Sequence, residues 1–568
     1  MSPIQKAKQQ ILRELKQAVG GGYVPHLEDL SEPPDAKMGD IAFACFLLAK
    51  KQKSNPTEIA NEIAAKIGPK GYVSHVRAVG PYVNFTFAHD IFGKDVLKDV
   101  DTLKDKYGTS AIGKDKRVMV EYANLNTHKD VHIGHLRNLF VGQMAVNVLR
   151  ANGYDVVPHA YINDLGAHVA KSVWAIMTLH AGEDVSKEKR ITFLRDVYIE
   201  STQYLEDHPN TKEQVSLVFR NLEDQKGPEV AVWKKTRKWS LDYLERVYGE
   251  LNIGIEEWYF ESNLIKKTKK EIDKLIKKGI VVQSEGAWIV DLRDQDLGVN
   301  LLVKSDGTLL YNAKDIGLAL KKEEDYHALR SIYVVDTRQS HAMQQLFATL
   351  KLMGFEKELT HLSYDFVTLK DGAMASRKGN DIRFELFRDK MVERASEETR
   401  ARHPDWNEKD ILENARTIAY AAMRFGMLKQ DIEKPIIFDL EESLVFEGYT
   451  GPYILYTYAR IKTLLKKAPK IKKSLSSKHL KAPVERKLLL LIADYPDLVF
   501  AVSQTLELSR VSQYLFDLAQ TFASFYSEIP VLKAEPEIVT ERLALVKAVG
   551  QTLQNGLKLM GIESIEEM

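Results

Sequence analysis

The feature that most constrains the fold of this chain is the order of its apolar runs between residues 117 and 162. Residues 118–122 form a β-rich apolar run of the length expected for a buried strand. Residues 133–148 then repeat apolar side chains every three or four positions, which predicts a helix with one apolar stripe. Residues 156–162 predict a second strand. Strand, helix and strand in this order predict a βαβ unit with a right-handed crossover.

The loop between that strand and that helix carries the chemistry. In an open α/β sheet, ligands bind at the carboxyl ends of the strands, which is where this loop lies. It ends in His132-Ile133-Gly134-His135, and a helix that starts near Ile133 points free N–H groups at a bound phosphate. Gly134 lets a nucleotide lie against the backbone. The two histidines share one face of the first turn, and each can donate a hydrogen bond to phosphate or add positive charge, with Lys129 as a further cation.

Two other interpretations of these histidines follow from the same residues. The histidines can simply cap the helix, or His128, His132 and His135 can bind a metal ion through their helical spacing. No His-Glu-x-x-His pattern is present, and no cysteine or carboxylate cluster lies close by in the sequence. The spacing therefore favours a phosphate site over a cap and disfavours a metal site.

The residues around this loop also resemble a known family. HIGH at 132–135, after a strand and at the start of a helix, is similar to the signature of class I aminoacyl-tRNA synthetases. The longer string EYANLNTHKDVHIGHLRN at 121–138 resembles the arginyl-tRNA synthetases in particular, and further matches cover nearly the whole chain. The resemblance implies a multidomain α/β fold: a Rossmann-like class I catalytic domain, an N-terminal α+β appendix and a C-terminal all-α anticodon-binding bundle. It also implies that the HIGH histidines steady the ATP phosphates during adenylation.

Three domains are expected on this basis, and 568 residues suit three or four. Residues 1–110 should form an N-terminal α+β domain that binds tRNA, since in the family this part contacts the outer corner of the tRNA. Residues 111–385 should form the catalytic domain, with 171–300 as a connective insertion in which we place no catalytic residue. Residues 386–568 should form a DALR-type helical anticodon-binding domain, helical throughout.

The N-terminal pattern predicts its own elements but no function. Residues 4–19 read as a helix, residues 37–67 as two helices, and residues 73–87 as strands around a Gly80-Pro81 turn. Cys45 is the one cysteine and lies in an apolar run, so we expect it in the core and no disulfide within the chain.

A pair of side chains in the second half of the catalytic region predicts the amino-acid pocket. Tyr311 and Asp315 are four residues apart, so they lie on one helix face, and a phenol beside a carboxylate suits a guanidinium. From these residues alone, a surface pair is equally expected. The resemblance implies instead that both bind the arginine side chain and that Gln339, after the next strand, joins them. The residues expected to bind arginine are Glu121, Asn126, His132, Tyr311, Asp315 and Gln339.

Two of these residues have less specific roles. Asn126 is expected to meet the amino or carboxylate end of arginine, and Glu121 either grips the ammonium or structures the loop. Residues 161–170, YINDLGAHVA, predict a second loop at the ligand edge, adjacent to the site rather than catalytic. The bland alternative is that Asp164 only caps the following helix.

The second class I signature, KMSKS, falls on residues 371–384. Only Met374 and Ser376 keep their types. When a carboxylate attacks the α-phosphorus, charge builds on the pyrophosphate, and fixed cations such as Arg377 and Lys378 stabilise it. The residues expected to bind ATP are His132, Gly134, His135, Met374 and Ser376.

Lys129 is the other candidate for the cation that this altered signature lacks. Some arginyl enzymes with an imperfect KMSKS carry a lysine three residues before the first HIGH histidine, and Lys129 holds that position. We expect it to share or replace the missing role; the alternative is a solvated loop charge. The residues expected to be catalytic are His132, His135, Lys129, Arg377 and Lys378.

The resemblance implies ATP-dependent ligation of L-arginine to tRNA(Arg) through an arginyl-adenylate, with Mg²⁺ carried on ATP and no protein metal site. The alternatives are a non-catalytic tRNA-binding paralogue, suggested by the altered KMSKS, and a class I synthetase for another amino acid. A net charge of +1 does not by itself announce a nucleic-acid binder. No apolar stretch approaches a membrane span, so we expect a cytoplasmic protein, and the family implies a monomer. Tyr514, Phe522, Phe525 and Tyr526 are expected in the core of the C-terminal bundle.

Overall fold

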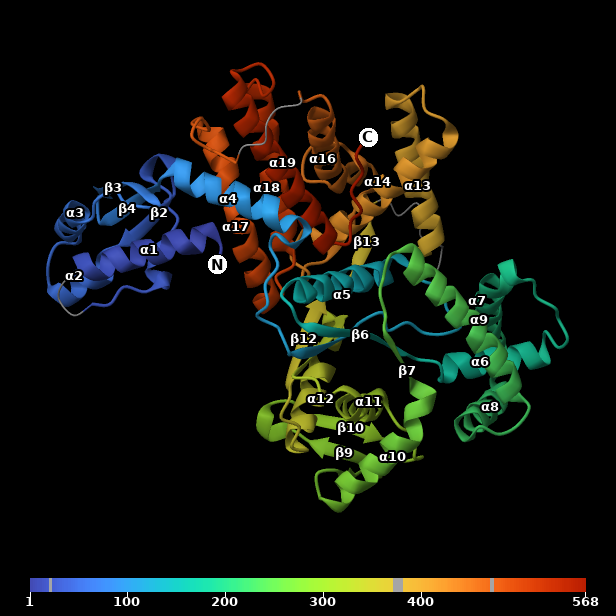
Figure 1. Cartoon of the computed structure of the whole chain (residues 1–568). Helices are drawn as coiled ribbons and strands as arrows, with labels where there is room; N and C mark the ends of the chain where they lie inside the picture. Colours follow the sequence, from blue (N-terminus) through green and yellow to red (C-terminus); the bar gives the residue numbers. More distant parts are fainter. Residues whose placement is uncertain (20–22, 371–381, 470–474) are drawn as a thin grey trace.

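A five-stranded parallel sheet forms the centre of the molecule, in the order β12-β11-β5-β6-β7. The computed structural model describes residues 1–19, 23–370, 382–469 and 475–568 (Figure 1). From β5 the chain first builds β6 and β7 on one side and later returns to build β11 and β12 on the other. The strand order therefore reverses between β5 and β11, and open α/β sheets bind ligands at the carboxyl ends of the strands at such a point. The strands are β5 (Arg117–Glu121), β6 (Asp155–Ile162), β7 (Glu257–Phe260), β11 (Arg330–Asp336) and β12 (Glu358–Tyr364).

Helix α5 (Ile133–Ala151) joins β5 to β6, so the expected βαβ unit is present. The expectation of a single apolar stripe was wrong, because α5 is buried on nearly all sides between the sheet and the helices α14, α17 and α19. Its polar side chains serve as ties. Asn138 accepts a hydrogen bond from the Ala123 N–H (2.8 Å) and donates one to the Val334 carbonyl (2.8 Å). This one side chain links the segments that follow β5 with β11.

The N-terminal module is a four-stranded antiparallel sheet, in the order β1-β2-β4-β3, covered by helices. Two helices were expected over residues 37–67, but Ile41–Ala44 form a strand, because this buried run pairs with β4. Cys45 is buried, as expected. The elements are α1 (Pro3–Ala18), β1 (Leu30–Ser31), β2 (Ile41–Ala44), α2 (Phe46–Gln52), α3 (Pro56–Lys66), β3 (Val73–Val79), β4 (Tyr82–Phe87) and α4 (His89–Leu103).

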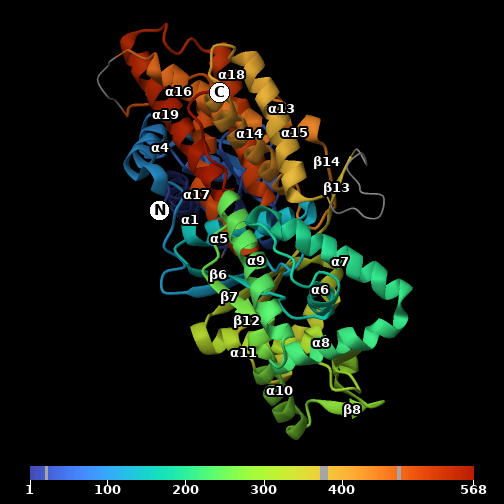
Figure 2. The same ribbon diagram turned by 90° about the vertical axis from the view of Figure 1, so that its right-hand side faces the viewer.

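The chain between β6 and β11 forms two additions to the central sheet. Helices α6 to α9 lie to the right of it in Figure 1 and face the viewer in Figure 2. A small antiparallel sheet, β10-β9-β8, packs against α11, which in turn packs against α10. Strand β7 lies within residues 171–300, yet it pairs with β6 in the central sheet. The elements are α6 (Ala167–Thr178), α7 (Arg190–Asp207), α8 (Lys212–Asp224), α9 (Glu229–Glu250), α10 (Glu261–Lys277), β8 (Val282–Ser284), β9 (Ala287–Asp291), β10 (Val299–Val303) and α11 (Tyr311–Tyr326).

The last third of the chain is a helical bundle above α5. The expectation of helix throughout was wrong at Ile436–Phe438, which forms β14 and pairs in parallel with β13. Three of the four aromatic residues expected in the core are buried, whereas Tyr526 is 40% exposed. Helix α12 (Ser340–Leu352) joins β11 to β12 and packs against β12, and β13 (Val367–Leu369) precedes the bundle. The elements of the bundle are α13 (Phe384–Arg402), α14 (Glu408–Leu428), β14 (Ile436–Phe438), α15 (Leu440–Leu444), α16 (Gly451–Lys466), α17 (Pro483–Thr505), α18 (Ser509–Glu528) and α19 (Pro536–Leu559).

Helix α17 corrects the expectation that no apolar stretch approaches the length of a membrane span. Within the described residues it is the one helix long and apolar enough to cross a membrane, by length and composition alone. It packs against α18, α19 and α5, and the core helix of a bundle passes the same test.

The two ends of the chain pack together. Helices α1 and α4 of the N-terminal module contact α17, and α4 also contacts α19 (Figure 1). The buried Asp40 carboxylate accepts a hydrogen bond from Arg486 Nε (3.2 Å). The Tyr107 hydroxyl donates to the Ile492 carbonyl (2.7 Å), and the Asn555 amide donates to the Lys104 carbonyl (2.9 Å). The N-terminal module therefore rests on the C-terminal bundle.

Candidate active site

The HIGH turn begins α5 at the carboxyl end of β5. The rings of His132 and His135 stack with centroids 3.5 Å apart, and the His132 N–H donates to His135 Nδ1 (3.1 Å). A Cβ at Gly134 would lie 3.1 Å from the His132 ring, so glycine gives that ring its place. The histidines thus cap the helix, which was one of the alternatives, and their rings lie together as the phosphate interpretation requires.

The protonation of His135 follows from its surroundings. Burial, together with the nearby His132 and Lys129, holds the pKa of His135 well below its usual value. Its ring is therefore neutral at neutral pH. Because Nδ1 accepts the backbone N–H, the proton of the neutral ring lies on Nε2. His135 can therefore donate a hydrogen bond from Nε2 but carries no charge at neutral pH.

His128 does not join the other two histidines. Its backbone is left-handed (φ 62°), and its Nε2 lies 2.8 Å from the Thr236 hydroxyl on α9. Burial lowers the pKa of His128 to about 3. Among the residues that the structure describes, no group of three or more His, Cys, Asp or Glu side chains is placed to hold a metal ion.

The residues that follow the second signature contact the first. Residues 371–381, with Met374, Ser376, Arg377 and Lys378, are outside the described residues. The residues that follow them pair with the HIGH turn: the Ile133 N–H donates to the Ile382 carbonyl (2.9 Å), and the Phe384 N–H donates to the Val131 carbonyl (2.8 Å). Residues 382–384 are therefore held against the HIGH turn.

The other end of the site gathers three carboxylates and two lysines. Lys322 Nζ lies 2.8 Å from the Glu121 carboxylate, and Lys314 forms an ion pair with Glu261. Asp315 forms no ion pair or hydrogen bond within the described residues, so the cluster holds one more acid than base. Burial, with Glu121 nearby, raises the pKa of Asp315 to about 7. Burial likewise raises the pKa of Glu261 to about 7, against the effect of its lysine partner.

Glu121 is the most enclosed member of this cluster. Besides Lys322, its carboxylate accepts from the Asn124 amide (2.9 Å) and lies 3.4 Å from His159 Nε2. Burial opposes its charge, yet Lys322 and His159 lower the pKa of Glu121 to about 2. With both oxygens engaged and the side chain buried, this geometry favours the loop-structuring alternative over direct contact with the ammonium.

The remaining predicted residues lie at the same sheet edge. Tyr311 is the first residue of α11, one turn before Asp315, and is 63% exposed. Asn126 bridges to Asn163 between the ends of β5 and β6. Gln339 ends the short turn that follows β11 and is exposed. Within the described residues, no hydrogen bond joins Gln339 to Tyr311 or Asp315, so it is their common edge that relates them.

Sequence reasoning set the segment after β6 beside the site but did not see what it contributes. Three buried polar atoms in this segment have no hydrogen-bond partner among the described residues: the Tyr161 hydroxyl, Asn163 Oδ1 and His168 Nε2. Such atoms are exceptional in a folded protein. The electrostatic neighbours of Tyr161 include Asp315 and Glu261, and those of His168 include Lys129 and Lys314. The segment thus lies between the two ends of the site and presents polar groups that a ligand would satisfy.

The alternative for Asp164 was wrong. Gly166, not Asp164, precedes the first turn of α6. The buried Asp164 carboxylate accepts hydrogen bonds from Arg237 Nε (2.6 Å) and the Ser262 hydroxyl (2.7 Å) instead. It ties the loop after β6 to α9 and α10.

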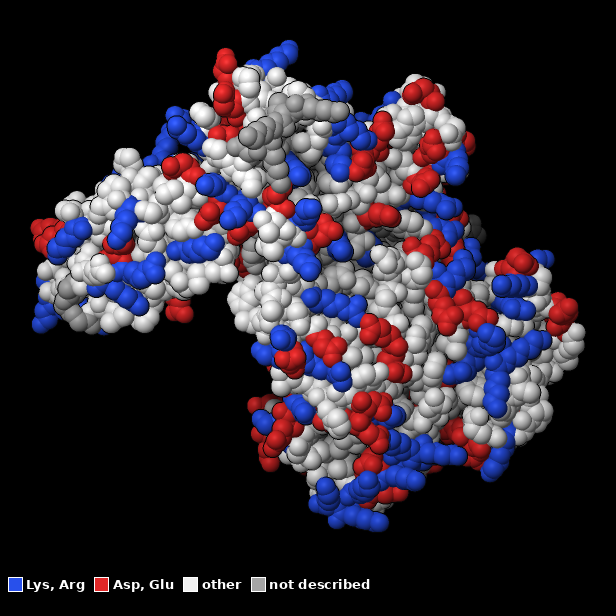
Figure 3. All heavy atoms as spheres, viewed as in Figure 1, with Lys and Arg blue, Asp and Glu red and all other residues white. Residues whose placement is uncertain are grey.

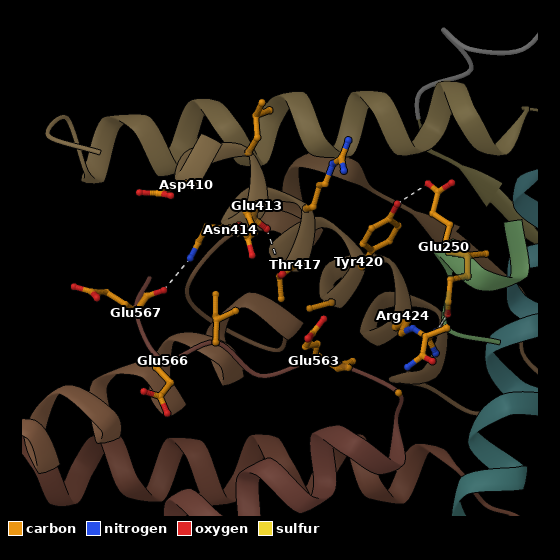
Figure 4. Close-up of a pocket in the computed structure, with 18 of the residues that line it drawn as sticks. Glu250, Asp410, Glu413, Asn414, Thr417, Tyr420, Arg424, Glu563, Glu566 and Glu567 are labelled. Atoms are coloured by element: carbon orange, nitrogen blue, oxygen red, sulfur yellow. Dashed lines mark hydrogen bonds between the residues drawn. The ribbon is translucent and has the colours of Figure 1, made fainter. Parts of the chain in front are cut away.

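Two cavities open in the C-terminal bundle, away from this edge. One, of about 1220 Å³, is lined by α14, the end of α9 and the C-terminal tail, and six of its lining residues are acidic against three that are basic (Figure 4). In it, Tyr420 donates to Glu250 (2.7 Å) and the Asn414 amide donates to the Glu567 carbonyl (2.8 Å). The acidic lining does not suit RNA phosphates.

The other cavity, of about 530 Å³, lies between α13, α16 and α18 and has a different lining. Arg402 stacks on Phe446 at 4.1 Å, and Arg460 stacks on Tyr456 at 4.7 Å. Aromatic faces beside arginines are the groups that bind unstacked nucleobases. On the face of the molecule shown in Figure 3, basic and acidic side chains are otherwise interspersed.

Comparisons with known proteins agree over the whole chain. Residues 97–440 match the family described as tRNA synthetases class I (R), catalytic domain; residues 454–568 match the DALR anticodon binding domain, and residues 5–87 the arginyl tRNA synthetase N terminal domain. The chain is 36% identical to the arginine–tRNA ligase of Bdellovibrio bacteriovorus, covering 98% of both chains, and 32% identical to that of Halothermothrix orenii, covering 99% of both. Its structure superposes on the arginyl-tRNA synthetase of Thermus thermophilus with a TM-score of 0.82 at 25% identity, covering 99% of this chain and 100% of that one.

Proposed function

The chain belongs to the arginyl-tRNA synthetase family and is an arginine–tRNA ligase that uses ATP, and we propose that its reaction takes place in a crevice at the carboxyl ends of β5 and β11. The expected fold class is confirmed: an N-terminal domain, a class I catalytic domain with a parallel sheet, and a C-terminal helical DALR domain. For the limits of these parts we propose residues 1–110, 111–385 with the insertion 171–300, and 386–568.

One observation carries the proposal for the amino-acid end: the cluster of three carboxylates and two lysines lacks one positive charge. The guanidinium of arginine supplies that charge beside Asp315, the one carboxylate of the cluster left without a partner among the described residues. Tyr311 covers its exposed side, and Gln339 closes the edge next to β11. The unpartnered Tyr161 hydroxyl, near Asp315, is placed to accept a guanidinium N–H. Glu121 acts through charge and through Lys322 rather than by contact.

At the other end, we propose that ATP lies over the HIGH turn. His132 and His135 donate hydrogen bonds to phosphate oxygens, and Gly134 and the first turn of α5 present backbone N–H groups. Asn126 orients the amino or carboxylate end of arginine toward the α-phosphorus. Lys129 stands beside His135 and His168 as a fixed cation. Met374, Ser376, Arg377 and Lys378 complete the proposed site from outside the described residues.

The reaction then needs little beyond positioning and charge. The arginine carboxylate attacks the α-phosphorus, the bond to pyrophosphate breaks, and the charge that gathers on the departing pyrophosphate is met by Lys129, Arg377 and Lys378. A ribose hydroxyl at the 3′ end of tRNA(Arg) next attacks the carbonyl carbon, and AMP leaves. We propose that Mg²⁺ arrives on ATP, as part of that substrate.

We propose two contacts with tRNA(Arg) outside the catalytic domain. The cavity of about 530 Å³ receives an anticodon base between Phe446, Tyr456 and the arginines Arg402 and Arg460. On the N-terminal module, the half-exposed Phe46 packs edge to face against Tyr82 with ring centroids 5.6 Å apart, which suits a base from the outer corner of the tRNA. We also propose a monomer in the cytoplasm, where a single buried cysteine is at home.

The decisive experiment is arginine-dependent exchange between ATP and pyrophosphate, measured with and without tRNA(Arg). We expect exchange with arginine and not with lysine or citrulline, because an unpaired buried carboxylate penalises a ligand that lacks a fitting cation. Exchange driven by a different amino acid, or tRNA binding with no exchange under either condition, would contradict the proposed site. The binding of ATP is measured separately, so that a failure at one end of the crevice is distinguished from a failure at the other.

A further inference from the structure

We infer that helix α7, which belongs to the insertion and not to the central sheet, positions Lys129 for adenylation through Tyr198 and Arg195. This inference rests on the role proposed above for Lys129. Arg195 and Tyr198 are three residues apart on α7, so they share one face of that helix. They meet two consecutive residues of the loop before the HIGH turn, Lys129 and Asp130.

The contact to Lys129 is a cation over an aromatic face. The Nζ atom of Lys129 lies 5.3 Å from the centroid of the Tyr198 ring, within the range of a cation–π interaction. Lys129 is exposed, and within the described residues it forms no ion pair with a carboxylate. A long lysine side chain has many rotamers, so a ring that attracts its ammonium narrows the positions it samples. The ring thus holds the Lys129 ammonium in place without neutralising its charge. A group that is to stabilise the departing pyrophosphate must keep that charge.

The contact to Asp130 fixes the backbone beneath that lysine. Arg195 Nη1 lies 3.5 Å from the Asp130 carboxylate, whose oxygens are both buried and accept no hydrogen bond from the described part of the chain. Arg195 also lies 2.8 Å from Asp196, so its own place on α7 is set. A buried carboxylate needs such a counter-charge close by. Removing Arg195 would therefore release the loop at the residue next to Lys129.

Helix α9 holds the same loop from another direction. The His128 N–H donates to the Ser240 hydroxyl (2.9 Å), and the Val131 N–H donates to the Tyr243 hydroxyl (3.1 Å). Residues 128–131 are thus held at every position by α7 or α9. The contacts from α9 are buried hydrogen bonds that fix the backbone, whereas Tyr198 is the aromatic residue that contacts the Lys129 ammonium among the residues that the structure describes. Tyr198 and Arg195 are accordingly positioning residues, since neither is placed against the reacting atoms.

The test compares Tyr198→Ala with Tyr198→Phe, which keeps the ring and removes the hydroxyl. In arginine-dependent pyrophosphate exchange, we expect Tyr198→Ala to lower kcat about threefold to fivefold, the size of an exposed cation–π contact, and to leave the KM for arginine unchanged. Tyr198→Phe should retain the kcat of the unmodified protein. Equal melting temperatures of the two variants exclude a general loss of folding. If Tyr198→Ala keeps the original kcat, or if both variants lose it equally, the inference is overturned.

A double-mutant cycle separates this inference from the one beneath it. With Lys129→Ala already in place, Tyr198→Ala should have no further effect on kcat, because the ring then has nothing to position. Multiplying effects would overturn the role of α7 while leaving that of Lys129 intact. If Lys129→Ala alone leaves kcat unchanged, the proposed role of Lys129 fails, and the inference about α7 falls with it. Arg195→Met should lower kcat, whereas Arg195→Lys should retain most of the original kcat. If both substitutions lower kcat to the same degree, that result also counts against the inference.

Discussion

The two ends of the crevice are built in different ways. The amino-acid end rests on buried ion pairs between residues of β5, α10 and α11, with Glu121 and Lys322 enclosed in the core. The phosphate end rests on a loop that α7, α9 and residues 382–384 hold from outside the sheet. The proposed arginine pocket is therefore enclosed in the packed core around the sheet, whereas the proposed ATP end also depends on α7, α9 and residues 382–384, which lie outside the central sheet.

The charges of the two ends differ in the same way. The amino-acid end keeps one carboxylate without a partner in the described structure, and the phosphate end keeps one lysine and two histidine donors. Each end thus lacks what its proposed substrate brings. A substitution at one end should therefore change the kinetic constants for one substrate and leave those for the other substrate unchanged. The predictions below test this separation in order of decreasing effect.

The largest effect is expected at Asp315. Asp315→Asn removes the carboxylate that faces the guanidinium, and kcat/KM for arginine in pyrophosphate exchange should fall about a thousandfold, the cost of losing one partner of a buried charge pair. Binding of ATP, measured by calorimetry, should remain. Burial disfavours the charged form of Asp315 in the folded protein. Asp315→Asn should therefore melt at a higher temperature than the unmodified protein at pH 8. A fall of less than tenfold, or an equal loss of ATP binding, would break the comparison.

The next effect is expected at His135. His135→Ala removes a neutral donor to the phosphates, so kcat should fall about a hundredfold, the usual result of losing one such donor. The KM for arginine should change little. His128→Asn, which alters a neighbouring buried histidine that faces α9, is the matched control for the effects of substitution on the loop. A rise in the KM for arginine as large as the fall in kcat would show that the two ends are not separate.

The pH dependence should also divide the two ends. Asp315 has a pKa of about 7 in the free protein, so its charge is present above pH 7 and is lost below it. The KM for arginine should then rise about tenfold for each pH unit below 7, while kcat for the bound substrate falls less, since His135 stays neutral throughout. Glu261 titrates in the same range, so the comparison is made with Asp315→Asn, which should show a much flatter profile. A flat profile for the unmodified protein would contradict the raised pKa.

The smallest effect is expected in the bundle, away from both ends. Arg460→Ala removes the arginine stacked on Tyr456, and the KM for tRNA(Arg) in aminoacylation should rise about tenfold, the cost of weakening one stacked base. The KM for arginine should not change. Arg416→Ala, in the acid-lined cavity, is the control, with no effect expected on the tRNA. Equal effects of the two substitutions would remove the distinction between the cavities.

The local sequence pattern predicted the helices and strands of this protein better than it predicted which side chains contact one another. The alternation around residues 118–162 predicted β5, α5 and β6, and four-residue spacing placed Tyr311 and Asp315 on one helix. The pair of Glu121 and Lys322 joins residues 201 positions apart, and no local pattern predicts it. Asp164 was misjudged for the same reason, because Arg237 and Ser262 are distant in sequence.

Two features that were not predicted, strand β2 and the buried Lys322, do have a recognisable signal in the sequence. Residues 41–48 are a continuous apolar run, which does not distinguish a strand from a helix, so β2 was missed. Lys322 lies seven residues after Asp315 on α11, and a lysine on the buried face of a helix indicates a paired charge. The contacts of α7 with the loop before the HIGH turn had no such signal, since they depend on how the insertion packs.

The packing of the first module on the last bundle has a mechanical consequence. Asp40 with Arg486, and Tyr107 with Ile492, join the two regions proposed to hold the outer corner and the anticodon of one tRNA. A rotation of the bundle over α5 would carry the N-terminal module with it. The distance between the two proposed tRNA contacts is therefore fixed. Under the two tRNA contacts proposed above, an RNA with matching bases but the wrong distance between its outer corner and its anticodon would reach only one of the two sites at a time.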